Sequence, residues 1–150
     1  MNNPEYKRAK ERALYILEQR DHSYSELYSK LEKNYSEEVC FAVCDKMTEI
    51  GLINDALYAE KLAKYYFTVK KYGKYRAFSE MRRKGLDDED IENASEEYLS
   101  DMTDRIREII EKKYLKYLSD EKGITKTKNA LVRLGYSYDD INSVMEEFYE

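Results

Sequence analysis

The chain has 150 residues, of which 38% are charged, and its formal net charge at pH 7 is −5. No apolar run approaches the ~18 residues that span a membrane, and the N-terminal segment MNNPEYKRAKERALYILEQR lacks the uninterrupted apolar core of a signal peptide. These features argue against a membrane protein and an exported protein, so we expect a cytoplasmic protein.

Helices are expected along most of the chain. One proline and five glycines leave few interruptions, and apolar residues recur on one face of a 3.6-residue period. In the first helix, Ala9, Ala13 and Ile16 share such a face. The pattern predicts an all-α fold, with helices over residues 5–19, 23–33, 36–50, 54–71, 75–84, 87–100, 102–119, 124–134 and 137–149.

A hinge between two helices occurs three times. It reads SELYSKLEKNYSEEV from Ser25, YRAFSEMRRKGLDDEDI from Tyr75 and KTKNALVRLGYSYDDI from Lys126. In each copy an apolar helix face runs to an Asn or a Gly, which can end a helix in the left-handed conformation. A Ser or Asp suited to cap the next helix follows two residues later.

The hinge recurs about every fifty residues, which indicates internal repeats. A unit of this size buries little apolar surface alone, so its neighbours must stack on it. We therefore predict one continuous domain of three tandem three-helix repeats, stacked into an elongated, curved array. The expected repeats are residues 1–53, 54–101 and 102–150. The alternative is one irregular helical bundle, whose hinges are alike because all helix ends use the same few residue types.

Charge is segmented along the chain. Residues 60–84 hold nine basic side chains against two acidic ones, and residues 85–111 hold eleven acidic side chains against two basic ones. Residues 112–133 are basic again, and residues 134–150 are acidic. Cations near helix C-termini and carboxylates near N-termini account for part of this alternation.

The loop around Gly73 holds more cations than helix ends require, which is typical of a surface that binds phosphates or an acidic partner. The candidate binding residues are Lys70, Lys71, Lys74, Arg76, Arg82, Arg83 and Lys84, with Lys126, Lys128 and Arg133 as counterparts in the third repeat. Tyr65, Tyr66, Tyr72 and Tyr75 interleave with them and are candidates for base stacking. On the other interpretation, tyrosines this frequent fall beside lysines by chance, and Tyr66 lies on an apolar face.

Residues for catalysis or metal binding are sparse. His22 is the one histidine, and it stands in no catalytic motif. Cys40 and Cys44 share a helix face, and with His22 they offer three zinc ligands, but packing in a helical core is the favoured interpretation. The acidic stretch DDEDIENASEE lacks the ligand spacing of an EF-hand. We expect neither an enzyme nor a cofactor.

Three segments resemble the RecX family of bacterial recombination regulators. They are RDHSYSELYSKL (Arg20–Leu31), EIGLINDALYAEKLA (Glu49–Ala63) and KKYGKYRAFSEMRRKGLDDEDI (Lys70–Ile91). The resemblance runs from about Ala13 to the C-terminus, and RLGYSYDDI falls where the family has its last unit.

The resemblance implies tandem three-helix repeats and a monomeric regulator. Such a protein binds the RecA filament on single-stranded DNA and modulates, usually inhibits, its ATP hydrolysis, growth and strand exchange. RecA is the implied partner, with single-stranded DNA as a second, weaker one. The alternative function is a helical-repeat nucleic-acid-binding module that acts without RecA. An enzyme ranks last.

Overall fold

The computed structural model describes residues 3–149, and all regular elements in that range are helical. The all-α prediction is therefore confirmed. The first unit holds α1 (Pro4–Gln19), α2 (Tyr24–Leu31) and α3 (Glu37–Glu49); the second holds α4 (Asp55–Lys64), α5 (Lys74–Arg83) and α6 (Asp88–Ser95); the third holds α7 (Met102–Ile109), α8 (Glu121–Arg133) and α9 (Tyr138–Met145). No helix within residues 3–149 is long and apolar enough to cross a membrane.

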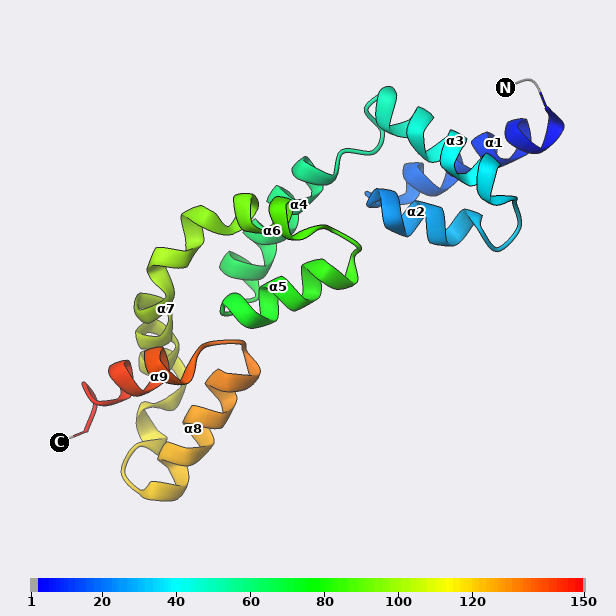
Figure 1. Cartoon of the computed structure of the whole chain (residues 1–150). Helices are drawn as coiled ribbons and strands as arrows, with labels where there is room; N and C mark the ends of the chain where they lie inside the picture. The colour runs from blue at the N-terminus through cyan, green and yellow to red at the C-terminus, as the bar shows by residue number, and fades with distance from the viewer. Residues whose placement is uncertain (1–2, 150) are drawn as a thin grey trace.

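The units follow one another along an elongated body, with the first unit at one end and the third at the other (Figure 1). Helices α2, α5 and α8, the second helix of each unit, lie in succession along one long edge. The prediction of a stacked helical array is therefore confirmed, and the alternative of one irregular bundle is wrong.

Helix starts in all three units are capped by side chains, and helix ends in the second and third units are closed by glycine. Ser23 and Glu26 form a reciprocal capping box at the start of α2. The side chains of Asp87 and Ser137 accept hydrogen bonds from the third residue of the helices that they precede. Gly85, like its counterpart in the third unit, adopts a positive φ at the preceding helix end.

Three of the expected helices are not α-helical along their whole length. The helix expected over residues 54–71 widens into a π-helical turn, Tyr65–Val69, and the helix expected over 102–119 does so at Ile110–Tyr114. The helix expected over 87–100 ends at Ser95, and a 3₁₀-helical turn, Glu96–Asp101, leads directly into α7. A 3.6-residue apolar pattern does not report such local changes in winding, which depend on tertiary contacts.

The first unit has a core of its own. Its largest fully buried side chains include Leu27, Leu31 and Met47. Cys40 and Cys44 are fully buried in this core, as the packing interpretation predicted. Burial raises the pKa of the Cys44 thiol to about 12, so the thiolate that binds metals is strongly disfavoured.

The second and third units share one continuous core. It runs from Tyr58 on α4 to Met145 on α9, with Phe67, Ile106 and Leu131 fully buried between them. Arg105 on α7 donates to the carbonyl of Phe67, which lies in the π-helical turn of the second unit. Stacking therefore merges the apolar cores of these two units, whereas the core of the first unit stays separate.

The same head-to-tail contact joins each pair of neighbouring units, because the second helix of one unit begins where the second helix of the next unit ends. At the start of α5, the backbone N–H of Gly73 donates to the carbonyl of Leu134 (2.8 Å) and that of Tyr75 to the carbonyl of Gly135 (3.1 Å). These donors belong to a helix start and the acceptors to a helix end, so each satisfies groups that the other leaves unpaired.

The start of α2 meets the end of α5 in the corresponding way. The hydroxyl of Ser23 donates to the carbonyl of Lys84, the last residue before the turn at Gly85. A hollow of about 540 Å³ remains between the first two units, and Leu14, Leu52 and Leu57 are among its lining residues. The first junction is therefore polar and incompletely filled.

Candidate functional site

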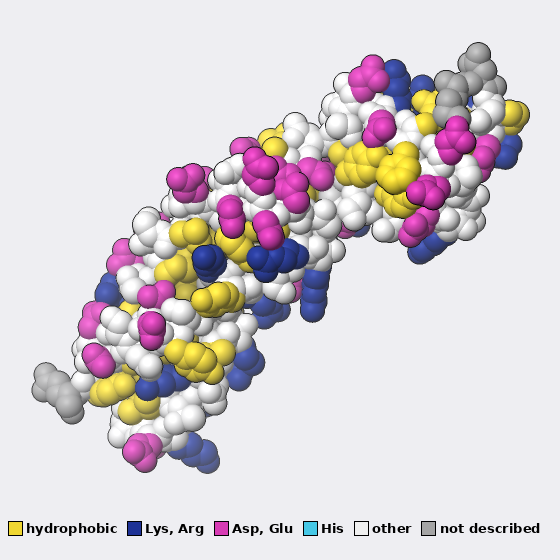
Figure 2. All heavy atoms as spheres, viewed as in Figure 1, with side chains coloured by type: hydrophobic (Ala, Val, Ile, Leu, Met, Phe, Trp, Pro, Cys, Tyr) yellow, Lys and Arg dark blue, Asp and Glu magenta, His cyan; other side chains and the backbone are white. Residues whose placement is uncertain are grey.

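Most candidate binding residues belong to α5 and α8, Lys84 directly follows α5, and Lys70 and Lys71 lie in the loop before α5. Figure 2 shows Lys and Arg side chains along the long edge formed by α5 and α8, while Asp and Glu side chains cover the opposite edge around α6 and α7. The acidic side follows from the first turns of the third helices, such as the run Asp88–Asp90 at the start of α6. The structure thus turns the segmentation along the sequence into two edges of opposite charge.

The guanidinium of Arg76 makes its contacts within the protein. It lies over the ring of Tyr72, 4.6 Å from the ring centre, and it pairs with Glu80 at 3.3 Å. Its Nη1 donates to the carbonyl of Arg133 at 3.0 Å, across the second junction. Arg76 therefore has a structural role at this junction, which local sequence could not reveal.

Lys71 is also part of the second junction. It has a φ of 58°, which is uncommon for a residue with a side chain, and its carbonyl accepts a hydrogen bond from the hydroxyl of Tyr136 at 2.6 Å. Burial raises the pKa of that hydroxyl to about 12, so it remains a donor. The Lys71 ammonium lies 4.0 Å from Glu108, a contact between half-exposed groups.

Two further candidates form ion pairs near the end of α5. Arg82 pairs with Asp88 at 3.0 Å, and Arg83 lies 3.7 Å from Glu80. All but Glu80 are largely exposed, so these pairs contribute little to stability and leave both guanidinium groups accessible to a partner.

The remaining candidates have no carboxylate partner within residues 3–149. Three of them lie over aromatic rings: Lys70 is 5.8 Å from the ring centre of Tyr65, Lys74 is 5.4 Å from that of Phe78, and Lys126 is 4.6 Å from that of Tyr117. A cation held over a ring keeps its charge available to a partner. The full set of candidates without such a pair is Lys70, Lys74, Lys84, Lys126, Lys128 and Arg133.

The interleaved tyrosines separate into two kinds. Tyr66 is buried and stacks on Tyr72, whose ring also carries the Arg76 guanidinium. Tyr65 and Tyr75 are exposed, Tyr75 to 64%. Base stacking therefore remains a hypothesis for Tyr65 and Tyr75, and the apolar role predicted for Tyr66 is confirmed.

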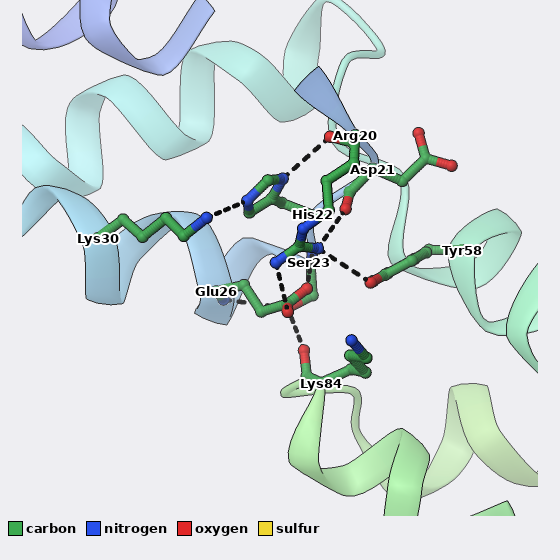
Figure 3. Close-up of polar contacts among 8 residues, drawn as sticks. All are labelled: Arg20, Asp21, His22, Ser23, Glu26, Lys30, Tyr58 and Lys84. Carbon is green, nitrogen blue, oxygen red and sulfur yellow. Dashed lines mark hydrogen bonds and ion pairs between the residues drawn. The ribbon is translucent and has the colours of Figure 1, made fainter. Parts of the chain in front are cut away.

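The segment RDHS, between α1 and α2, forms a polar cluster at the first junction (Figure 3). The Arg20 guanidinium contacts Glu26 and the hydroxyl of Tyr58 on α4, both at 3.4 Å. The backbone N–H of Tyr24 donates to the carboxylate of Asp55 at 3.0 Å. The capping box of Ser23 and Glu26 is local to this segment, whereas the contacts with the second unit depend on the fold and leave no signal in the local sequence.

His22 lies in the same segment and is only 3% exposed. Its Nδ1 is 3.0 Å from the carbonyl of Arg20, and its Nε2 is 2.7 Å from the ammonium of Lys30 (Figure 3). An ammonium can only donate, so Nε2 accepts and Nδ1–H donates to the carbonyl. This arrangement requires a neutral imidazole, and burial lowers the pKa of His22 in agreement with it.

Comparison with known families gives three matches along the chain. Residues 9–47 match the model described as the first three-helix domain of RecX, residues 54–94 the second and residues 100–145 the third. Each match covers helices of one unit, in the same order.

Individual relatives agree with these matches. The chain is 30% identical to the regulatory protein RecX of Amycolatopsis mediterranei, over 95% of this chain and 83% of the relative. It is 29% identical to the regulatory protein RecX of Pseudomonas fluorescens, over 89% of this chain and 86% of the relative. The crystal structure of RecX from Lactobacillus salivarius superposes with a TM-score of 0.85 at 24% identity, and the match covers 96% of each chain, which shows that the fold is shared.

Proposed function

This chain belongs to the RecX family of regulatory proteins, and from that membership we propose that it binds the RecA filament on single-stranded DNA. Its binding modulates the ATP hydrolysis, growth and strand exchange of the filament, with inhibition as the expected direction. The contact is made by the basic edge of α5 and α8, with Lys74 and Lys126 as the central residues, because each lies on one of these helices with its ammonium over an aromatic ring.

The observation that supports this proposal is the head-to-tail arrangement of α5 and α8, which each carry four basic residues and one acidic residue, whereas α2 carries one of each. A filament presents the same surface at regular intervals, and an array that repeats its cations from the second unit to the third is suited to touch more than one subunit. Complementary charge then sets the register and speeds the encounter. The opposite, acidic edge faces away from such a partner and disfavours binding in the wrong orientation.

The test is ATP hydrolysis by the host's RecA on single-stranded DNA, measured with increasing amounts of this protein. Wild-type protein should lower the rate at stoichiometric amounts. The double variant K74Q/K126Q should need roughly tenfold more protein for the same effect, because two charges leave the contact. K7Q/K113Q removes two exposed cations that lie outside the edge and should behave as wild type. An unchanged ATPase at excess wild-type protein would refute the proposal.

Direct binding of single-stranded DNA without RecA is the second candidate function. Two exposed tyrosines next to lysines favour it. The Lys70 ammonium lies 5.8 Å from the ring centre of Tyr65, and Tyr75 follows Lys74 in the sequence. Binding of this kind weakens steeply with salt, because phosphate contacts release counterions. A gel-shift series that shows no complex even at low salt would eliminate it.

A further inference from the structure

The first unit contains a basic hollow that lies outside the edge described above. Its volume is about 470 Å³, and it lies between α1, α2 and the turn that follows α2. Four cationic side chains line it: Arg12, Arg20, Lys30 and Lys33. The size is in the range of small-molecule sites in proteins.

The hollow has an excess of positive charge. No Asp or Glu is among its lining residues, and within residues 3–149 no ion pair reaches Arg12, Lys30 or Lys33. Arg20 alone has a carboxylate partner, Glu26 at 3.4 Å. Cations gathered without counter-ions favour an anion, because each of them loses repulsion when the anion binds.

His22 fixes one of these cations in place. The neutral imidazole, held by the carbonyl of Arg20, accepts a hydrogen bond from the Lys30 ammonium at 2.7 Å (Figure 3) and so orients it. Both residues line the hollow. Burial lowers the pKa of Lys30, and the nearby charge of Arg20 lowers it further. A bound anion would oppose both effects, because an opposite charge nearby favours the protonated ammonium.

Aromatic side chains complete the lining. Tyr15 is 52% exposed, and the guanidinium of Arg12 lies 5.2 Å from its ring centre. Tyr35 lines the hollow as well. An exposed ring and a flat guanidinium next to bound phosphate are the groups on which a nucleobase stacks.

We propose that this hollow binds a nucleotide, with its phosphate held by Arg12, Lys30 and Lys33 and its base stacked on Tyr15. A free nucleoside triphosphate and a nucleotide of single-stranded DNA share this chemistry. The site requires no RecA, so its test does not depend on binding to the filament. It lies in the first unit, apart from Tyr65 and Tyr75 of the second unit, to which direct DNA binding was assigned above.

The test uses the full chain at low salt, with ATP, inorganic tripolyphosphate and an oligo(dT) strand as separate probes in calorimetric titrations. At least ATP or oligo(dT) should bind, and R12Q/K33Q should weaken that binding roughly tenfold or more. K7Q/K10Q removes two cations from the same helix, outside the hollow, and should leave the affinity unchanged. Y15L should weaken ATP or oligo(dT) several-fold without affecting tripolyphosphate.

The outcomes identify the source of the nucleotide or reject the site. Preference for ATP over oligo(dT) indicates a free nucleotide, and the reverse preference indicates a strand of DNA. The proposal is refuted if neither ATP nor oligo(dT) binds at millimolar concentration, or if R12Q/K33Q binds as well as K7Q/K10Q. Equal affinity for ATP and tripolyphosphate, together with no effect of Y15L, would refute the role of Tyr15 in base stacking.

Discussion

The two junctions of this protein have the same head-to-tail geometry but differ in what fills them. At the second junction, backbone N–H groups at the start of α5 donate to carbonyls at the end of α8, and an apolar core runs continuously through both units. At the first junction, the hydroxyl of Ser23 makes the corresponding contact, the surrounding contacts are polar, and the cores on either side are separate.

The difference shows that helix-end hydrogen bonding alone can set how units stack, while apolar burial decides how tightly they are coupled. The connections agree with this division. A 3₁₀-helical turn leads from α6 straight into α7, whereas a turn and an extended segment, residues 50–54, separate α3 from α4. We therefore expect the second and third units to unfold together and the first unit to open at a lower cost.

The largest effect is expected at the second junction, from G135A. Gly135 has a φ of 102°, and an added Cβ would overlap the backbone of Arg76. Gly51 serves as a control, because it has a φ of 84° but open space around it. The cost of G51A, about 1 kcal/mol of unfolding free energy, therefore comes from backbone strain alone. G135A should cost roughly 3–4 kcal/mol of unfolding free energy, measured by urea denaturation.

Hydrogen exchange would locate this loss. Amides of α5 and α8 should exchange faster in G135A, while those buried in the first unit keep their wild-type rates. Equal costs for G135A and G51A would contradict the tight contact at the second junction.

A smaller effect is expected at the first junction, from S23A. The substitution removes the cap of α2 and the bond to the Lys84 carbonyl, for about 2 kcal/mol in total. S137A removes a cap that makes no hydrogen bond to another unit within residues 3–149, and it should cost about 1 kcal/mol. If the two variants lose the same free energy of unfolding, the hydroxyl of Ser23 does not couple the units.

The first unit should also weaken in mild acid, through His22. Because burial and the charges of Arg20 and Lys30 lower its pKa in the folded chain, only the unfolded chain takes up the proton just below pH 6.5. Unfolding is therefore favoured as the pH falls through that value.

Thermal unfolding at pH 7.5 and 5.5 checks this sign. The midpoint of wild-type protein should fall more between the two conditions than that of H22Q, which has no titrating ring. A parallel decline in both proteins would assign the pH dependence to other groups.

The smallest effect is expected from the ion pair between Asp21 and Lys61, which bridges the first two units at 3.2 Å. Both side chains are more than half exposed, so a double-mutant cycle of D21N and K61Q should give a coupling of about 0–0.5 kcal/mol that disappears in 1 M salt. A coupling above about 1 kcal/mol would mean that the polar junction is stronger than its exposure indicates.

Local chemistry explains which features could be predicted from the sequence. The caps at Ser23, Asp87 and Ser137 were predictable, because each depends on residues within one helical turn. The burial of Tyr66 and of Cys40 was also predictable, because each lies on the apolar face of its helix.

The candidate site was only partly predictable. The cations of α5 and α8 follow from composition, and the edge that they share follows from the repeat. Two roles could not be predicted: the contact of Arg76 across the second junction and the hydrogen bond between His22 and Lys30. Both depend on partners that come together only in the folded chain. The π-helical turns were unpredictable for the same reason.

The start of α5 has a consequence for synthesis on the ribosome. Its N-cap, Gly73, has no side chain to accept a hydrogen bond, and its first amides rely on the carbonyls of Leu134 and Gly135. Those acceptors emerge only after α8 of the third unit has been translated. The first unit carries its own serine cap and a separate core, so it can fold as it emerges, whereas the second unit must wait for the third to complete it.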